Sequence, residues 1–144
     1  MIRFTQLVLI QKLSDKYEVP EGLASKMPAV AGQVLVKGDG DGTVSNEKVK
    51  MYRSTVATCM FMMQWSRPDI SNAVRGLARH MTAPREAHVC GLTTLLKYVI
   101  HTKHRGLLIA PRDMWKMTYK FKIHGRSDLD YATNPDDCRS ISGG

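Results

Sequence analysis

The spacing of apolar residues along the chain predicts helices over most of its length and strands near its end. Apolar positions recur at helical spacing between Thr5 and Tyr17, and Thr5 is a suitable cap, so a helix is expected over 5–17. Residues 18–50 are interrupted by prolines and a glycine run, and only 34–36 resembles a strand. We interpret 18–50 as a connector.

Three helices are predicted next. The stretch 51–65 is apolar nearly all round, as expected of a helix buried on several sides. Ser66 is then expected to cap a second helix, with Pro68 in its first turn and Asp69 as the capping-box acid. Opposite the apolar face of this second helix runs a polar row of Arg67, Ser71, Arg75 and Arg79. A third helix is expected over 85–101, and the short links between the three predict an antiparallel bundle.

After Gly106 the pattern changes from helical to alternating. Residues 107–110 form a short apolar run, and apolar and polar residues alternate over 115–123. A hairpin with its turn near 111–113 is therefore predicted. The fold class is α+β: a helical bundle followed by a β-hairpin.

Charge is concentrated in the middle of the chain. The net charge is +8, and residues 51–110 hold eight basic residues against two acidic ones, which favours an anionic partner.

The composition, 43% hydrophobic and 24% charged, is that of one modest domain. No apolar run approaches the roughly 20 residues of a membrane span, and no secretion signal is recognised, so an intracellular protein without membrane contact is expected. Reduced thiols are expected at Cys59, Cys90 and Cys138.

Two candidate metal patterns fail on spacing. In the acidic glycine run 38–42, a calcium loop would need a glycine where Val44 stands and an acid where Lys50 stands, so a solvated turn is favoured. A dinucleotide-binding fingerprint would need a buried strand before the glycine run and a third glycine that opens a helix, and the sequence shows neither convincingly. Another candidate cluster consists of His80, His88, Cys90, His101 and His104. Its spacing matches no common zinc site, and we interpret these histidines as added positive charge.

Two groups of residues are candidates for binding. One is a set of basic side chains that could follow a nucleic-acid backbone by releasing counterions: Arg53, Arg67, Arg75, Arg79, Arg85 and Lys97. On charge alone, an ordinary solvated helix face is slightly favoured over this interpretation. The other is Asp128, just beyond the alternating strand, with Asp130 two residues later. A carboxylate at a strand end can hold a divalent metal, although such a motif is usually a turn.

Three segments carry a family resemblance when they are taken in order: MYRSTVATCMFMMQWSRPDISNAVRGLARHMTAPREAH, LLKYVIHTKHRGLLI and HGRSDLDYATNPDDCRSISG. Together they resemble the Pol polyprotein of copia-type LTR retrotransposons, at the end of the reverse transcriptase domain and the start of RNase H. The resemblance covers roughly residues 50–144. The chain departs from the family's usual residues at Arg126, Tyr131, Thr133, Cys138 and Ile141, but it keeps the acid at Asp128.

The resemblance implies a division of the chain into three parts. Residues 1–50 would be an N-terminal helix and connector, 51–110 a segment like the thumb and connection of reverse transcriptase, and 111–144 the incomplete start of an RNase H-like domain. It implies that Asp128 is the first RNase H carboxylate, a ligand of magnesium in a complete domain. Asp130 matches the second acid of the motif, with its role left open.

The resemblance also implies partners and limits on activity. An RNA/DNA hybrid or duplex nucleic acid is the expected partner, possibly together with the rest of the polyprotein. The Y-x-D-D motif of the polymerase does not occur in the chain, so we expect no catalysis and no cofactor for this chain alone. The alternatives are a non-catalytic, basic nucleic-acid-binding or adaptor module and a decayed reading frame.

Overall fold

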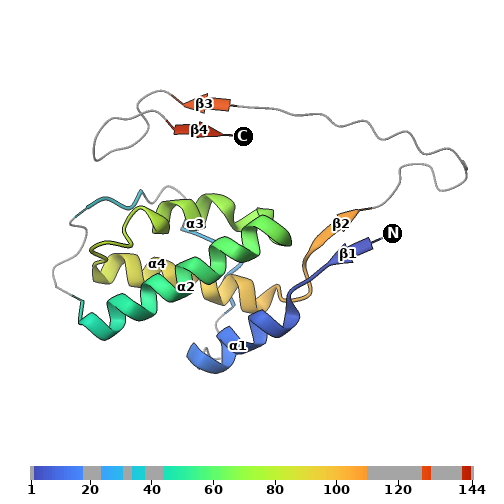
Figure 1. The fold of residues 1–144 in the computed structure, drawn as a ribbon, viewed down its shortest axis with the longest axis horizontal. Helices are drawn as coiled ribbons and strands as arrows, with labels where there is room; N and C mark the ends of the chain where they lie inside the picture. Colours follow the sequence, from blue (N-terminus) through green and yellow to red (C-terminus); the bar gives the residue numbers. More distant parts are fainter. Residues whose placement is uncertain are drawn as a thin grey trace, which may run out of the picture. The chain divides into compact units, whose positions relative to one another are not determined.

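The chain forms two compact units, Met1–Ile109 and Ala110–Gly144. A computed structural model describes residues 2–17, 24–30, 34–37, 44–109, 128–130 and 141–143, the last two stretches by their backbone alone. Within these stretches, no helix is both long and apolar enough to cross a membrane. Figure 1 shows the elements of each unit.

The first unit is mainly helical, with one small sheet. Its elements in chain order are β1 (Ile2–Phe4), α1 (Leu7–Tyr17), α2 (Asn46–Trp65), a 3-10 turn (Pro68–Ile70), α3 (Ser71–Ala78), α4 (Glu86–His101) and β2 (Leu107–Ile109). The second unit contains β3 (Asp128–Asp130) paired antiparallel with β4 (Ile141–Gly143). These elements agree with an α+β class, and the helices predicted over 5–17 and 85–101 are confirmed by α1 and α4.

Helix α2 begins before the expected position, at Asn46 instead of Met51. The side chain of Ser45 accepts a hydrogen bond from the backbone N–H of Lys48 at 3.4 Å and caps the helix. Apolar spacing missed this polar first turn. The prediction that the stretch 51–65 is buried on several sides is also wrong, because Phe61 and Trp65 are 51% and 61% exposed.

The expected capping box at the start of the next helix is also wrong. Ser66 ends α2: its backbone N–H donates to the carbonyl of Met62 at 3.0 Å, and its hydroxyl donates to Gln6 at 3.1 Å. The chain then passes through the 3-10 turn into α3, and Asp69 pairs with Arg67 instead of capping a helix. The same residues can satisfy either local pattern, and here tertiary contacts decide between them.

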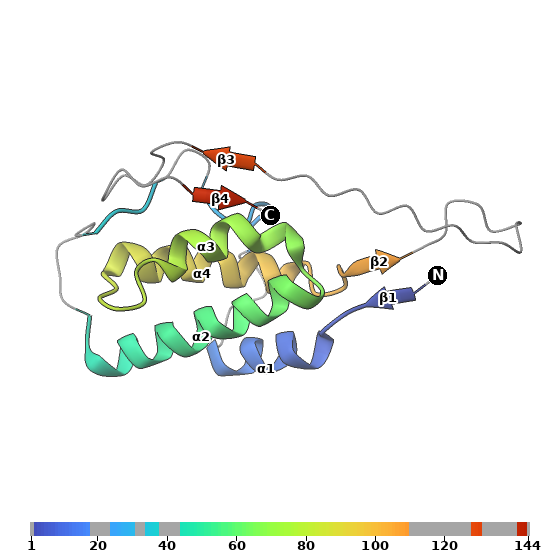
Figure 2. The same cartoon turned by 45° about the horizontal axis from the view of Figure 1, so that its top comes forward.

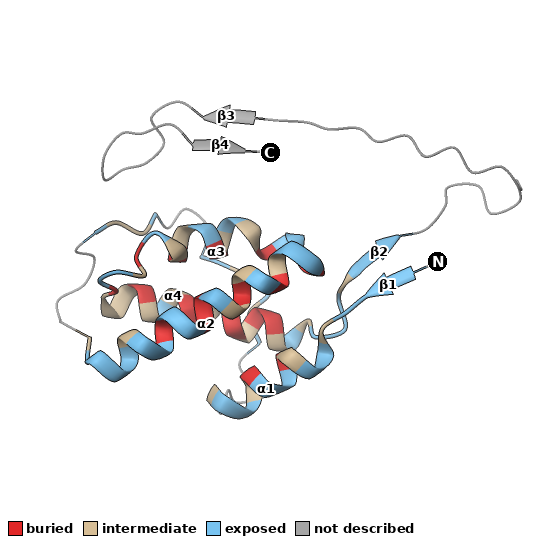
Figure 3. Cartoon of the chain, viewed as in Figure 1, coloured by how far each residue is buried: buried red, intermediate tan, exposed pale blue. Residues whose placement is uncertain are grey.

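One hydrophobic core joins the four helices of the described part. Figure 3 shows the buried residues on the faces that the helices turn toward one another. They include Ile10 and Leu13 of α1, Val56 of α2, Val74 of α3 and Leu95 of α4. The expected compact bundle is therefore present, with α1 packed against α4 as an additional member.

The small sheet joins the start of the first unit to its end. β1 and β2 pair antiparallel, with Ile2 opposite Ile109 and Phe4 opposite Leu107, and Figure 2 shows the two strands side by side beyond α1. A strand at Leu107 was expected, but with 115–123 as its hairpin partner. Residues 115–123 lie outside the described stretches, and the described partner comes from the other end of the unit.

Gly106 allows β1 to approach the chain just before β2. A Cβ at this position would overlap the backbone carbonyl of Phe4, and the side chain of Thr5 would lie only 2.8 Å from it. Gly106→Ala should therefore lower the free energy of unfolding by about 1–3 kcal/mol, as overpacking does. Urea unfolding followed by circular dichroism measures this effect.

Gly76 provides the matched control. It lies within α3, and a Cβ there meets nothing within 4 Å. Gly76→Ala should raise the free energy of unfolding by about 0.5–1 kcal/mol because alanine is the better helix former. Equal effects of the two substitutions would contradict the close approach at Gly106.

Candidate nucleic-acid interface

Arg67 is buried at the centre of a polar network, with its side chain 1% exposed. Its Nε and Nη2 each donate to one carboxylate oxygen of Asp69, both at 2.9 Å. Nη2 also donates to the hydroxyl of Thr102 at 2.7 Å, and Nη1 donates to its carbonyl at 3.2 Å. The guanidinium therefore joins the turn before α3 to the residue that ends α4.

Tyr98 extends this network toward the surface. Its hydroxyl donates to Asp69 at 2.9 Å and accepts from Nη1 of Arg105 at 3.0 Å. The guanidinium carbons of Arg67 and Arg105 lie 5.5 Å and 5.9 Å from the centroid of the Tyr98 ring, within cation–π range. The expected role of Arg67 in a cationic surface row is therefore corrected, because its donors are directed inward.

The network also sets the ionisation of Asp69. Burial raises the pKa of Asp69, but hydrogen bonds from Arg67 and Tyr98 and the charge of Arg67 outweigh it, so the net pKa lies below its usual value. The carboxylate thus stays ionised at neutral pH. The charge of the buried arginine is compensated within the fold.

Arg53 has a different environment. It lies on α2 and is exposed, yet its Nε donates to the carbonyl of Met81 at 2.6 Å and its Nη2 to that of Thr82 at 2.8 Å. These bonds hold the link between α3 and α4 against α2. They also fix the guanidinium in place, while Nη1 takes part in neither bond.

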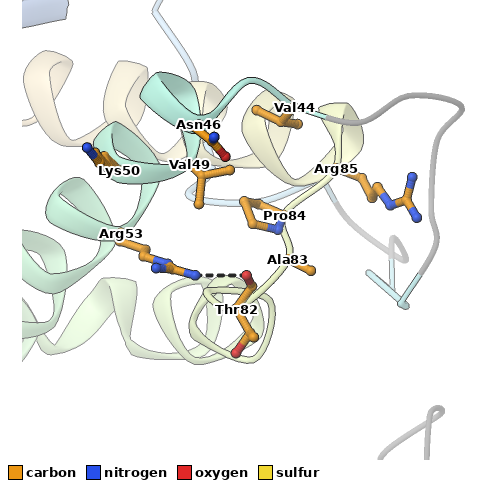
Figure 4. Close-up of a pocket in the computed structure, with 9 residues that line it drawn as sticks. All are labelled: Val44, Asn46, Val49, Lys50, Arg53, Thr82, Ala83, Pro84 and Arg85. Atoms are coloured by element: carbon orange, nitrogen blue, oxygen red, sulfur yellow. Dashed lines mark hydrogen bonds between the residues drawn. The ribbon is translucent and has the colours of Figure 1, made fainter.

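Arg53 lines a surface pocket of about 450 Å³. The lining residues are Val44, Asn46, Val49, Lys50, Arg53, Thr82, Ala83, Pro84 and Arg85. Three of them are cationic and none is acidic. In the view of Figure 4, Lys50 and Arg85 extend toward opposite sides, with Arg53 between them and bonded to Thr82. Three cations and no acid around one surface pocket favour an anion such as a phosphate group over a cation.

Two of the six predicted basic residues, Arg53 and Arg85, meet at this pocket. Arg75 and Arg79 are exposed on α3 and at its end, and Lys97 is half-buried on α4; none of these three lines the pocket. Sequence reasoning missed Lys50. Its spacing of three residues from Arg53 would have placed both on one face of a helix, had α2 been extended to include it.

Cysteines and histidines form no metal site in the described part of the chain, where no group of three metal-binding side chains is found. His80 and His88 are buried and stacked on each other, whereas His101 and His104 are exposed, so the predicted charge role does not apply to the buried pair. Cys59 is buried, and burial raises its pKa to about 12. Cys90 is an exposed free thiol.

Asp128 and Asp130 lie on β3, where the backbone pairs Asp128 with Gly143 and Asp130 with Ile141. Their side chains lie outside the described part of the structure. The predicted role of the two carboxylates in magnesium binding and catalysis therefore stays a prediction. Cys138 also lies outside the described residues.

Comparison with known proteins identifies relatives. The chain is similar to the retrovirus-related Pol polyproteins from transposons RE1 and RE2 of Arabidopsis thaliana, with 33% and 30% identity over 92 residues. The matches cover 64% of this chain and 6% of each polyprotein. The chain is also 32% identical over 92 residues to the secreted RxLR effector protein 161 of Plasmopara viticola, covering 61% of that protein. No family model and no solved structure matches.

These relatives confirm the resemblance to retrotransposon Pol polyproteins. The match spans only about 6% of the length of each of the two transposon relatives. Their names do not specify the copia type.

The network around Arg67 predicts loss of stability in acid. Because the pKa of Asp69 is lowered by folding, its contribution is complete above the ordinary carboxyl value of about 3.9 and is lost as pH falls through the lowered folded value. Asp69→Asn should remove this part of the pH dependence. At pH 7 the substitution should lower the free energy of unfolding by about 2–4 kcal/mol. This range already allows for solvent screening, because the Asp69 side chain is 35% exposed.

Urea unfolding between pH 7 and pH 3 tests this prediction. The control is Asp15→Asn on α1, where the exposed carboxylate accepts only a local hydrogen bond from Gln11 at 2.8 Å. This control should keep the wild-type profile. Parallel pH profiles for Asp69→Asn and wild type would contradict the assignment.

Proposed function

We propose that the chain is a thumb-like segment of a copia-type reverse transcriptase and RNase H polyprotein, and that its helical unit holds an RNA/DNA hybrid. The observation that carries this proposal is the cationic pocket of Lys50, Arg53 and Arg85, which contains no acid among its lining residues. The similarity to transposon Pol polyproteins supports it. We place the protein in an intracellular particle or the nucleus.

Contacts to phosphate are sufficient for this role. A polymerase must hold duplexes of any sequence, and phosphate contacts position a protein without reading bases. Arg53 is suited to such a contact because its two bonds to backbone carbonyls orient the guanidinium in advance. Lys50 and Arg85 add charge on either side, and the release of counterions supplies the favourable free energy.

Binding to a hybrid should therefore depend on salt and on the pocket. Lys50→Gln and Arg85→Gln should each weaken binding of the full chain to a 20-base-pair RNA/DNA hybrid and reduce the slope of log K against log salt by about 1. Fluorescence anisotropy over a salt series measures both. Lys12→Gln on α1 removes the same charge away from the pocket and should leave the slope unchanged. Equal losses of affinity in all three variants would indicate that binding depends only on the net charge of the chain and not on the pocket.

The RNase H part of the proposal concerns Asp128 and Asp130. In a complete domain Asp128 would contribute to magnesium binding, but hydrolysis through two metals needs several carboxylates from separate elements. The chain alone should therefore not cleave a hybrid. An assay with labelled hybrid and excess magnesium should show no more cleavage with the chain than with buffer alone. Turnover that disappears in Asp128→Asn would overturn this expectation.

A non-catalytic adaptor module is the second candidate. It is favoured by the effector relative, of which the chain covers a much larger share than of the polyproteins. It is also favoured by exposed apolar residues, among them Phe61 and Trp65, whose rings lie 6.3 Å apart. In a polyprotein the same surface could be covered by the remaining chain. As a basic nucleic-acid-binding or adaptor module, the chain would bind duplex nucleic acid in a salt-dependent way, and no binding at low ionic strength would count against this candidate.

A further inference from the structure

Two buried histidines hold a short segment of the connector against the bundle. His80 follows α3 and His88 lies in the first turn of α4, and they are 3% and 0% exposed. Their rings stack with centroids 4.0 Å apart and an angle of 14° between planes. Neither ring contributes to the cationic pocket, whose lining contains no histidine.

Hydrogen bonds fix the protonation of His88. Its Nδ1 accepts from the backbone N–H of Arg85 at 2.8 Å, so the ring proton lies on Nε2, which donates to the carbonyl of Val36 at 3.1 Å. Nε2 of His80 lies 3.3 Å from the carbonyl of Leu35, which can only accept. The two rings thus bind two successive carbonyls, and the ring of His88 is neutral in this arrangement.

These carbonyls belong to residues 34–37, which we call the strap. The sequence suggested a strand here, but no strand partner exists among the described residues. Instead the Leu35 side chain packs against α4, with Cδ1 3.5 Å from the position of a Cβ on Gly91. The histidine pair and Leu35 are therefore among the contacts that attach the strap to the bundle.

Protonation is incompatible with this arrangement. A proton on Nδ1 of His88 removes the acceptor that the Arg85 N–H uses, so this hydrogen bond is lost. Charging both rings would also place two buried positive charges 4.0 Å apart. Imidazoles titrate near pH 6.5 in general, so the conflict arises in mild acid.

The surrounding charges strengthen this conflict. The charged and titratable residues of the described elements around the pair are Lys37 on the strap, Arg75 on α3, Arg79 and Arg85 on the link, Glu47, Lys48, Lys50, Tyr52, Arg53 and Cys59 on α2, and Glu86, Cys90, Lys97, Tyr98 and His101 on α4. The acids among them are Glu47 and Glu86, and Glu86 is engaged by Lys48 at 3.1 Å. Lysines and arginines outnumber these acids, so the surrounding charge opposes a further positive charge on the rings.

We infer that His80 and His88 form an acid-sensitive latch, which holds the strap at neutral pH and releases it when the rings are protonated. Release should be local because the fully buried core residues lie on the four helices and the 3-10 turn, whereas Leu35 of the strap is only partly buried against them. The inference does not rest on the proposed function. Since the Arg85 backbone is part of the latch, release would also loosen one edge of the cationic pocket.

Methyl NMR on the full chain tests the latch directly. Leu and Val methyl groups are labelled, and spectra are recorded between pH 7.5 and pH 5, about one unit or more on either side of the general imidazole midpoint. As the pH falls, the Leu35 and Val36 signals should move toward random-coil positions. Their midpoint should match that of the His88 ring signals. Leu95 and Val99, in the buried core, should not move.

Two variants serve as comparison. His80→Gln keeps an N–H donor for Leu35 but cannot be charged, so it should reduce the acid response of the strap. His101→Gln removes an exposed histidine and should leave the response unchanged. The latch is overturned if the Leu35 and Val36 methyl signals of the wild type stay fixed after the His88 ring has titrated. It is also overturned if His80→Gln, when folded, responds to acid as the wild type does.

Discussion

A buried guanidinium must have its charge and its donors satisfied within the protein, and this requirement on Arg67 organises the helical unit. Asp69 supplies the charge and both of its oxygens, and Thr102 supplies two further acceptors. Because these partners lie before α3 and after α4, the pair fixes how one helix begins and the other ends. The hydrophobic core then packs between elements whose ends are already defined.

The same constraint separates structural from surface cations. The basic residues of the central segment look equivalent in the sequence, and their total charge gives no way to distinguish them. In the structure Arg67 is internal, Arg53 supports the α3–α4 link through two carbonyls, and Lys50 and Arg85 line the pocket beside it. The proposed interface is therefore smaller than the charge count suggested, and it includes a lysine that the candidate residues omitted.

The spacing of apolar residues predicted those helices whose buried face is visible in the local sequence. Helices α1 and α4 follow from the spacing of residues such as Leu13 and Leu95, because apolar residues at helical spacing need a common buried face. Strand β1 could not be found in this way, because its partner lies at the other end of the unit and pairing across such a distance leaves no local pattern. The capping box failed at Asp69 for a related reason.

The site was only partly predictable for a physical reason as well. A row at helical spacing shows which side chains share a face, but not whether that face meets solvent or another element. Arg67 therefore seemed part of a surface row until the end of α4 was placed against it. His80 and His88 likewise read as added charge, although both are buried and bind backbone carbonyls of the strap.

The most direct test of this account is a double-mutant cycle on Arg67 and Asp69, measured by urea unfolding at pH 7. Arg67→Met and Asp69→Leu should each cost about 3 kcal/mol or more, because each leaves one charge without its partner. The double variant should cost less than the sum by about 2 kcal/mol. Losses that add to within about 0.5 kcal/mol would show that the two residues are not coupled and would contradict the account.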